Sequence, residues 1–317
     1  MKALRSIILG IAALSGLVDP ARAQSTQQPP QAASQPATQA SQPLRFEHPT
    51  PASQDDQSAL ADAMEGPRTS WHVQFEPKVR YVGPAGDVSI PGAGSPAMTV
   101  DLADLDLNAP KLMPGFDLSL RRGRFRVNAI GLFYEIEDRT ARADEAFALG
   151  SVAFAPGQRS SVDHDYAQID FRFAYTLLDE AFRPLANRLG HRARVRVDAE
   201  AGLRIYDFEF EYENLDTGAR GADDRTFFEP HAGFKASFDI FEELTVDLYT
   251  NFGAWPFDAQ AYSWDIGVGF QWRPVDYFGL QIGYRSTMFL LNEGTGADEF
   301  EWNGSYQGLH AGIQFRF

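Results

Sequence analysis

The sequence predicts an all-β fold, an antiparallel transmembrane β-barrel of about ten strands, and three observations lead to it. Apolar and polar residues alternate with a period of two in ten segments from residue 70 onward, which is the pattern of strands with two unlike faces. Glycine (27 residues) and aromatic residues (13%) are plentiful, whereas charged residues reach 22%, a mixture typical of strands joined by turns. Finally, no apolar run approaches the ~20 residues that a membrane-spanning helix needs.

The ten expected strands share this alternation. They are Trp71 to Tyr81, Phe116 to Leu120, Phe125 to Phe133, Ala167 to Leu177, Ala193 to Ile205, Pro230 to Phe238, Leu244 to Phe252, Tyr262 to Trp272, Phe278 to Met288 and Leu309 to Phe317. Ile130 and Leu132 break the polar set of the third segment, so we expect a β-bulge there. A count of eight or twelve strands would also be even, as bacterial membrane barrels require.

The aromatic residues distinguish a membrane barrel from a soluble sandwich. Both folds alternate, but a sandwich buries its apolar faces in a shared core, whereas a membrane barrel turns them to lipid. Tyr262 and Trp272 mark the two ends of one apolar face. At ~3.3 Å per residue and a tilt of ~40° they are ~25 Å apart along the membrane normal, the height of a lipid-facing band.

The connections alternate between short and long, which a barrel with two unlike ends requires. Short connections lie at 121–124, 239–243 and 273–277. The long ones are expected at 83–112, 138–162, 215–225 and 291–301. By the general rule we expect the short ones in the periplasm and the long ones outside the cell.

Residues 1–23 read as a secretory signal peptide. Lys2 and Arg5 precede the apolar run Ile7 to Val18, and Ala21 and Ala23 supply the small residues of a cleavage site. Residues 24–69 read as a disordered periplasmic tail, since residues 24–50 contain seven Gln and five Pro and cannot bury enough apolar surface to fold. The barrel is expected over 70–317.

Charge and cysteine content exclude several classes of function. The chain has 28 Lys and Arg against 43 Asp and Glu, a formal net charge of −15, so it is not a nucleic-acid binder that works through a basic surface. It contains no cysteine, which excludes disulfides, thiolate nucleophiles and Cys-based metal sites.

From Ser70 to Phe317 the chain resembles bacterial outer-membrane β-barrel proteins. The most specific feature is the final alternating strand, with Phe315 and Phe317 at its end, which is similar to the C-terminal signal read by the barrel-assembly machinery. The resemblance implies the outer membrane of a Gram-negative-type bacterium, contact with lipid and lipopolysaccharide, and no cofactor. Ten strands and an acidic rim are also features of omptin-type surface proteases, whose Asp and His pairs sit at the barrel mouth.

The polar faces of the predicted strands carry many charges, which we expect to face the lumen. The expected lumenal charge network comprises Glu76, Arg80, Asp170, Arg172, Arg194, Arg196, Asp198, Glu200, Arg204, Glu229, His231, Lys235, Asp265 and Arg285. Eight strands give an interior just filled by side chains and sixteen leave a channel, so ten strands predict a lumen plugged by ion pairs. A narrow conduit and a lumenal catalytic or ligand site are the alternatives.

Asp163, His164 and Asp165 stand where the fourth predicted strand meets its outer loop. A histidine between carboxylates could act as a general base or a metal ligand. Adjacent residues on a strand point to opposite faces, so His164 cannot share a face with either aspartate. We therefore expect a solvated rim here, with no catalytic residue and no metal site.

Acidic residues are concentrated in or near the expected outer loops: Asp101, Asp104 and Asp106 in the first; Glu209, Glu211 and Glu213 near the third; Glu293, Asp298, Glu299 and Glu301 in the last. Carboxylates suit divalent cations, although the spacing of an EF-hand is absent. The sequence favours a non-catalytic barrel, structural or surface-interacting through these loops, with divalent cations as candidate partners. A narrow porin-like channel for small solutes and a barrel-mouth hydrolase remain the alternatives.

Overall fold

The computed structural model describes residues 70–92, 98–182, 193–241, 243–255, 257, 259–295 and 299–317. The predicted signal peptide (1–23) and periplasmic tail (24–69) lie outside these residues. No helix long and apolar enough to cross a membrane occurs in the described part of the chain.

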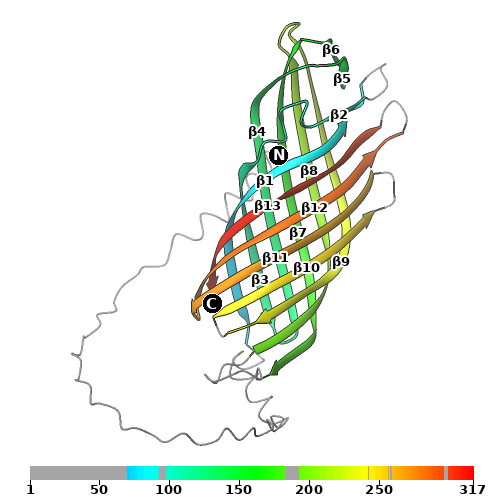
Figure 1. Cartoon of the computed structure of the whole chain (residues 1–317). Coiled ribbons are helices and arrows are strands. Elements are labelled where there is room, and N and C mark those ends of the chain that lie inside the picture. Colours follow the sequence, from blue (N-terminus) through cyan, green and yellow to red (C-terminus); the bar gives the residue numbers. More distant parts are fainter. Residues whose placement is uncertain are drawn as a thin grey trace, which may run out of the picture. The chain divides into compact units, whose positions relative to one another are not determined.

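In the described residues, ten long strands close into an antiparallel barrel (Figure 1). They are β1 (His72–Ser89), β3 (Lys111–Arg122), β4 (Phe125–Arg142), β7 (Arg159–Phe182), β8 (Ala193–Asn214), β9 (Ala219–Asp239), β10 (Leu244–Trp255), β11 (Ala259–Val275), β12 (Phe278–Glu293) and β13 (Phe300–Arg316). Each strand pairs with the next along this series, and β13 pairs with β1. The predicted fold class is therefore confirmed.

The described residues also form three short strands at one end of the barrel. β2 (Thr99–Asp101) pairs with the end of β1, and β5 (Phe147–Leu149) forms a small hairpin with β6 (Val152–Phe154) between β4 and β7. Figure 1 shows all three at the end opposite the C-terminus. Their apolar residues join the buried core at that end, with Val100, Leu149 and Phe154 at most 4% exposed.

Several strands are longer than the sequence predicted. β7 has 24 residues and β8 has 22, and a four-residue turn at 215–218 joins β8 to β9. The long connections expected at 138–162 and 215–225 are therefore mostly strand. They are missed because the alternation continues there with the opposite polarity.

Strand β8 shows this change of polarity most clearly. From Ala193 to Ile205 its apolar side chains point outward and its charged ones inward, while from residue 206 onward the two sets exchange faces. Tyr206, Phe208 and Phe210 point inward and are at most 1% exposed, whereas Asp207, Glu209, Glu211 and Glu213 point outward. The pairing of β8 with β9 has no register shift from Arg194 to Asn214, so the exchange is a property of the sequence.

The neighbouring strands change polarity at the same level. On β9 the inward side chain changes from Glu229 to Phe227, and on β13 from His310 to Tyr306 and Trp302. In a membrane the outer face must be apolar, whereas in water the apolar side chains turn inward to form a core. We call the part that ends at Ile205 of β8 and its strand partners the membrane region. The part beyond it, which includes residues 206–214 of β8, is the outer extension.

The expected β-bulge at Ile130 and Leu132 is wrong. Both residues face the lumen in regular pairing with β7, and the register shift of these two strands lies between Ile136 and Arg139. Leu132 is 3% exposed within the core of the outer extension. The apolar residues on the polar face of β4 thus mark the start of the polarity change.

Candidate functional site

The end of the barrel that carries the C-terminus has the short turns and is assigned to the periplasm by the general rule. Here the backbone N–H of Val73 donates to the carbonyl of Phe317 over 3.0 Å, so the last residue joins the seam that closes the barrel. Phe317 is 75% exposed, and the ring of Phe315 lies 6.3 Å from that of Phe278. Their role as an assembly signal stays a prediction.

Asp265 on β11 is a centre of the lumenal network. It is fully buried and accepts from Arg285 at 2.5 Å and 2.7 Å, from Arg172 at 3.3 Å and from Arg204 at 3.3 Å. The hydroxyl of Thr287 donates to it as well. One carboxylate thus connects strands β7, β8 and β12 across the lumen.

Asp170 on β7 is a second centre. Its Oδ2 accepts from Arg172 Nη2 at 2.6 Å and from Arg204 Nε at 3.2 Å, and its Oδ1 lies 2.8 Å from His231 Nε2. The Oε1 atom of Glu229 accepts a hydrogen bond from Arg204 Nη1 at 3.4 Å and one from the hydroxyl of Ser263 at 2.6 Å. Burial of these charges is tolerated because each is paired.

Nearer the periplasmic end, Arg126 bridges Glu200 at 2.8 Å and Asp198 at 3.0 Å. Arg194 pairs with Asp179 at 2.5 Å. Arg126 and Asp179 were not among the predicted network residues. The sequence does indicate that Arg126 faces the lumen, because it lies between the apolar residues Phe125 and Val127 on an alternating strand.

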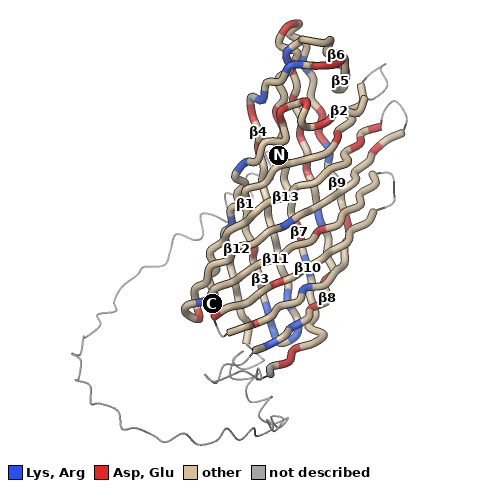
Figure 2. The backbone as a smooth tube through the Cα atoms, in the orientation of Figure 1, with Lys and Arg blue, Asp and Glu red and all other residues tan. Residues whose placement is uncertain are grey.

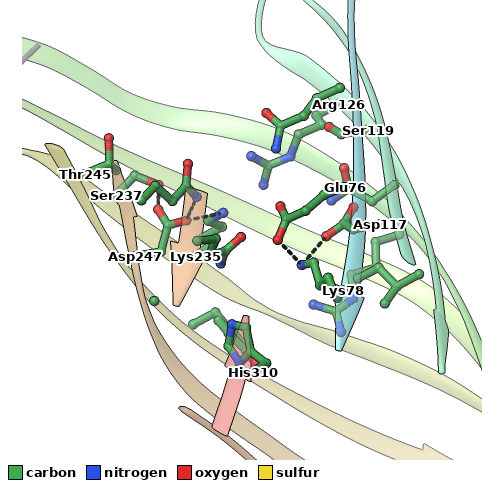
Figure 3. Close-up of a pocket in the computed structure, with 18 of the residues that line it drawn as sticks. Glu76, Lys78, Asp117, Ser119, Arg126, Lys235, Ser237, Thr245, Asp247 and His310 are labelled. Carbon is green, nitrogen blue, oxygen red and sulfur yellow. Dashed lines mark hydrogen bonds and ion pairs between the residues drawn. The ribbon is translucent and has the colours of Figure 1, made fainter. Parts of the chain in front are cut away.

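Two further ion-pair clusters stand on opposite walls of the lumen, as Figure 3 shows. Lys78 lies 3.2 Å from Glu76 and 3.3 Å from Asp117. Across from it, Lys235 lies 2.8 Å from Asp247. Glycines leave room for these long side chains: a Cβ on Gly312 would lie 2.5 Å from Oε1 of Glu76.

All fourteen predicted network residues face the lumen. Among the described residues, thirteen of them have a charged or hydrogen-bonding partner, Arg196 included, and Arg80 has none. Within the described part of the chain, twelve basic and ten acidic side chains face the lumen of the membrane region, an excess of two positive charges. They are Lys78, Arg80, Arg121, Arg126, Arg172, Arg194, Arg196, Arg204, Lys235, Arg273, Arg285 and Arg316, and Glu76, Asp117, Asp170, Asp179, Asp198, Glu200, Glu229, Asp239, Asp247 and Asp265.

A polar cavity of about 140 Å³ lies among these side chains. It extends from Arg80, His310 and Arg285 toward Arg196 and Arg316 at the periplasmic end. The latter two are partly exposed, so the cavity is reached from that side.

Above the network, aromatic side chains fill the lumen of the outer extension. The rings of Tyr166 and Tyr306 stack at 4.5 Å, and Trp302 lies 5.1 Å from Phe208. All four side chains are at most 4% exposed. This aromatic layer closes the barrel above the polar cavity.

His164 belongs to this aromatic layer, and the expected solvated rim is therefore wrong at this residue. Its ring stacks on Phe210 at 4.4 Å, its Nε2 lies 2.7 Å from the hydroxyl of Tyr306, and its side chain is fully buried. Burial lowers the pKa of His164 to about 3, so the imidazole is neutral. Sequence reasoning missed this because it assumed a polar inner face at every level.

The outer surface of the extension is acidic. Glu135, Asp165, Glu209 and Asp224 stand abreast on β4, β7, β8 and β9, and Figure 2 shows acidic positions along this half of the barrel. Some predicted loop acids have basic partners, such as Asp106 with Arg139 and Glu293 with Arg225. No group of three or more His or acidic residues that could hold a metal ion occurs in the described part of the chain, and Asp298 lies outside it.

Among known proteins, similarity is found to solved structures. No family model matches the chain, and no curated protein matches it. The outer membrane protease OmpT from Escherichia coli is similar at 9% identity and a TM-score of 0.47, over 80% of this chain and 100% of that one. Neisserial surface protein A is similar at 10% identity and a TM-score of 0.29, over 78% and 97%.

Ail, the attachment invasion locus protein of Yersinia pestis, is similar at 13% identity and a TM-score of 0.23, over 76% of this chain and 98% of that one. These similarities concern the fold alone. The assignment rests on the chain's own barrel, whose membrane region exposes Phe171, Phe173, Phe234 and Phe270 and keeps its charges inside. The described part of the chain therefore forms a transmembrane β-barrel.

Proposed function

We propose that this protein is a closed, non-catalytic barrel that works as a surface-interaction protein through the acidic face of its outer extension. The observation that carries the proposal is the polarity change on β8, because it places Glu209, Glu211 and Glu213 on the outside of a rigid strand beyond the membrane. A charged face on a barrel is better positioned for binding than one on separate loops.

The row formed by Glu135, Asp165, Glu209 and Asp224 also supports this proposal. Like charges directly opposite each other do not stabilise a sheet, so strand pairing alone gives no reason for this row. Such a surface suits cations, and we propose that divalent cations bridge it to the phosphates of neighbouring lipopolysaccharide. Attraction of this kind weakens as salt shortens the Debye length to ~8 Å at physiological strength.

The alternatives receive less support from the geometry. A channel needs a continuous polar path, but the aromatic layer around Tyr306, Phe208 and Trp302 fills the lumen above the cavity. A barrel-mouth hydrolase needs an accessible base, but His164 is fully buried and Asp163 and Asp165 lie on the opposite face of its strand.

The test uses the refolded full barrel with purified lipopolysaccharide in the presence and absence of Ca²⁺. We expect binding that requires Ca²⁺, weakens with salt, and falls at least ~10-fold in the triple variant Glu209→Gln, Glu211→Gln and Asp224→Asn. The matched control is Glu180→Gln with Glu243→Gln and Asp276→Asn, three exposed acids at the periplasmic end, which should bind like the wild type. Equal binding by both variants, or steady conductance in planar bilayers, would contradict the proposal.

A further inference from the structure

We infer that the lumenal cavity is a binding site for one small dianionic oxyanion, such as inorganic phosphate or sulfate, with Arg80 as its anchor. The site is separate from the acidic outer face, so the inference does not depend on the proposed function. It rests on an unpartnered buried guanidinium, on the charge balance of the lumen and on the arginines at the periplasmic opening.

Arg80 is the first observation. Its side chain is 7% exposed and lines the cavity beside His310, its cross-strand neighbour. Among the described residues it forms no ion pair, and its Nε has no hydrogen-bond partner. The acid that acts on it electrostatically is Asp265, whose oxygens are already shared by three other arginines.

A buried charge without a partner is costly, and a guanidinium has five N–H donors in a fork that matches the oxygens of phosphate, sulfate or carboxylate. His310 adds a second buried group at the same end of the cavity, because it is 6% exposed and its Nδ1 has no partner among the described residues. Figure 3 shows His310 at the edge of the space between the two ion-pair clusters. An oxyanion there would satisfy groups that the protein leaves unsatisfied.

The charge balance favours a divalent ligand. The excess of two positive charges in the lumen of the membrane region is what one dianion would neutralise. A cavity of about 140 Å³ has room for a small oxyanion with a few waters, but not for a nucleotide or a sugar phosphate with its substituents.

The periplasmic opening provides a route for the anion. Of the described residues, five arginines face the lumen there, Arg121, Arg194, Arg196, Arg273 and Arg316, against the two acids Asp179 and Asp239. A cleft with an excess of one sign of charge concentrates ions of the opposite sign. Anions from the periplasm would therefore be drawn into the cavity, whereas the acidic outer extension would repel them.

The test measures inorganic phosphate binding to the refolded full barrel by calorimetry, in a chloride background of constant ionic strength. We expect one saturable site in the wild type, a similar response to sulfate, and weaker binding of acetate because it carries one charge. Arg80→Gln should lose at least ~10-fold in affinity, since hydrogen bonds to a charged group contribute this much. Arg80→Lys, which keeps the charge but not the fork, should lie between the two.

Arg220→Gln is the matched control, because it removes one positive charge at an exposed site, 75% exposed, at the outer end. It should bind phosphate like the wild type. Without phosphate or sulfate, in chloride buffer, the Tm of Arg80→Gln should be no lower than that of the wild type, since the substitution removes a charge that has no protein partner. Non-saturable binding by the wild type, unchanged affinity in Arg80→Gln, or failure of that variant to fold would overturn the inference.

Discussion

The membrane region and the outer extension are built from the same strands with opposite polarity. Up to Ile205 of β8, the inward side chains are mostly charged and the outward ones apolar. From Tyr206 onward, the inward side chains are aromatic and the outward ones acidic. The backbone pairing does not change between them. The comparison teaches that the surroundings of the barrel, lipid or water, decide which face of each strand is apolar.

The two regions are consequently stabilised in different ways. The lumen of the membrane region depends on buried ion pairs around Asp170 and Asp265, whose loss leaves uncompensated charges. The outer extension depends on burial of aromatic side chains such as Trp302 and Phe208, which are fully buried. Substitutions, pH and salt should therefore affect the two regions differently.

The largest effect is expected for Asp265→Ala in the membrane region. The substitution leaves Arg285, Arg172 and Arg204 short of a shared carboxylate, and removing one partner of a buried ion pair costs about 3–5 kcal/mol. Urea unfolding of the refolded barrel would measure the loss. The matched control is Asp216→Ala, whose partner Arg159 is half exposed, and it should lose much less stability because exposed ion pairs contribute little. Equal losses would indicate a water-filled lumen.

A second prediction compares the outward faces of the two regions on one strand. Arginine on the lipid-facing side of a barrel costs about 2–4 kcal/mol at the midplane of the membrane, so Ala201→Arg should lower the free energy of unfolding in lipid by about this amount. Glu211→Arg, ten residues along the same face, should be close to neutral. The measurement is unfolding in liposomes. A similar cost at both positions would place the edge of the membrane beyond Glu211.

The third prediction concerns pH in the outer extension. Burial lowers the pKa of His164 from 6.5 to about 3, so the folded protein keeps a neutral imidazole while the unfolded chain takes up a proton below pH 6.5. The stability that this group contributes is fully present above pH 6.5 and is lost as the pH falls. By pH 5 the loss is about 2 kcal/mol.

His164→Gln removes the titrating group and should flatten this part of the stability curve. The variant and the wild type are compared by chemical unfolding between pH 5 and pH 7. Parallel curves would show that the imidazole is protonated within the folded barrel, and the aromatic layer would then be open to water.

The strand number and the membrane region could be predicted from sequence because a single rule, apolar outside and polar inside, holds along every strand there. The outer extension could not, because the rule reverses. The alternation is as regular from Tyr206 to Tyr212 as from Ala193 to Ile205. The boundary is marked only because the apolar residues move from the odd to the even positions. The segment Asp207–Phe208–Glu209–Phe210 looked like a charged loop when its acids were considered without its aromatic residues.

The lumenal residues could be predicted as a set but not as pairs. Alternation shows that Arg196 and Asp198 share a face, but the partner of Asp198 is Arg126 on β4, which β7 separates from β8. Contacts across the lumen depend on barrel curvature and on side-chain length, which one sequence does not encode. The unpartnered state of Arg80 was hidden for the same reason.

The smallest effect is expected for Arg196→Ala in the membrane region. Arg196 is partly exposed near the periplasmic opening, and Asp198 keeps its bonds to Arg126 at 3.0 Å and to Thr176 at 2.7 Å without it. The loss should be less than about 1 kcal/mol, as for exposed ion pairs. Arg126→Ala, which removes a bridge between two buried carboxylates, should cost about 1.5–3 kcal/mol. Urea unfolding of the two variants side by side tests this order, and a larger loss for Arg196→Ala would mean that the ion pairs at the opening, and not those deeper in the lumen, hold the membrane region together.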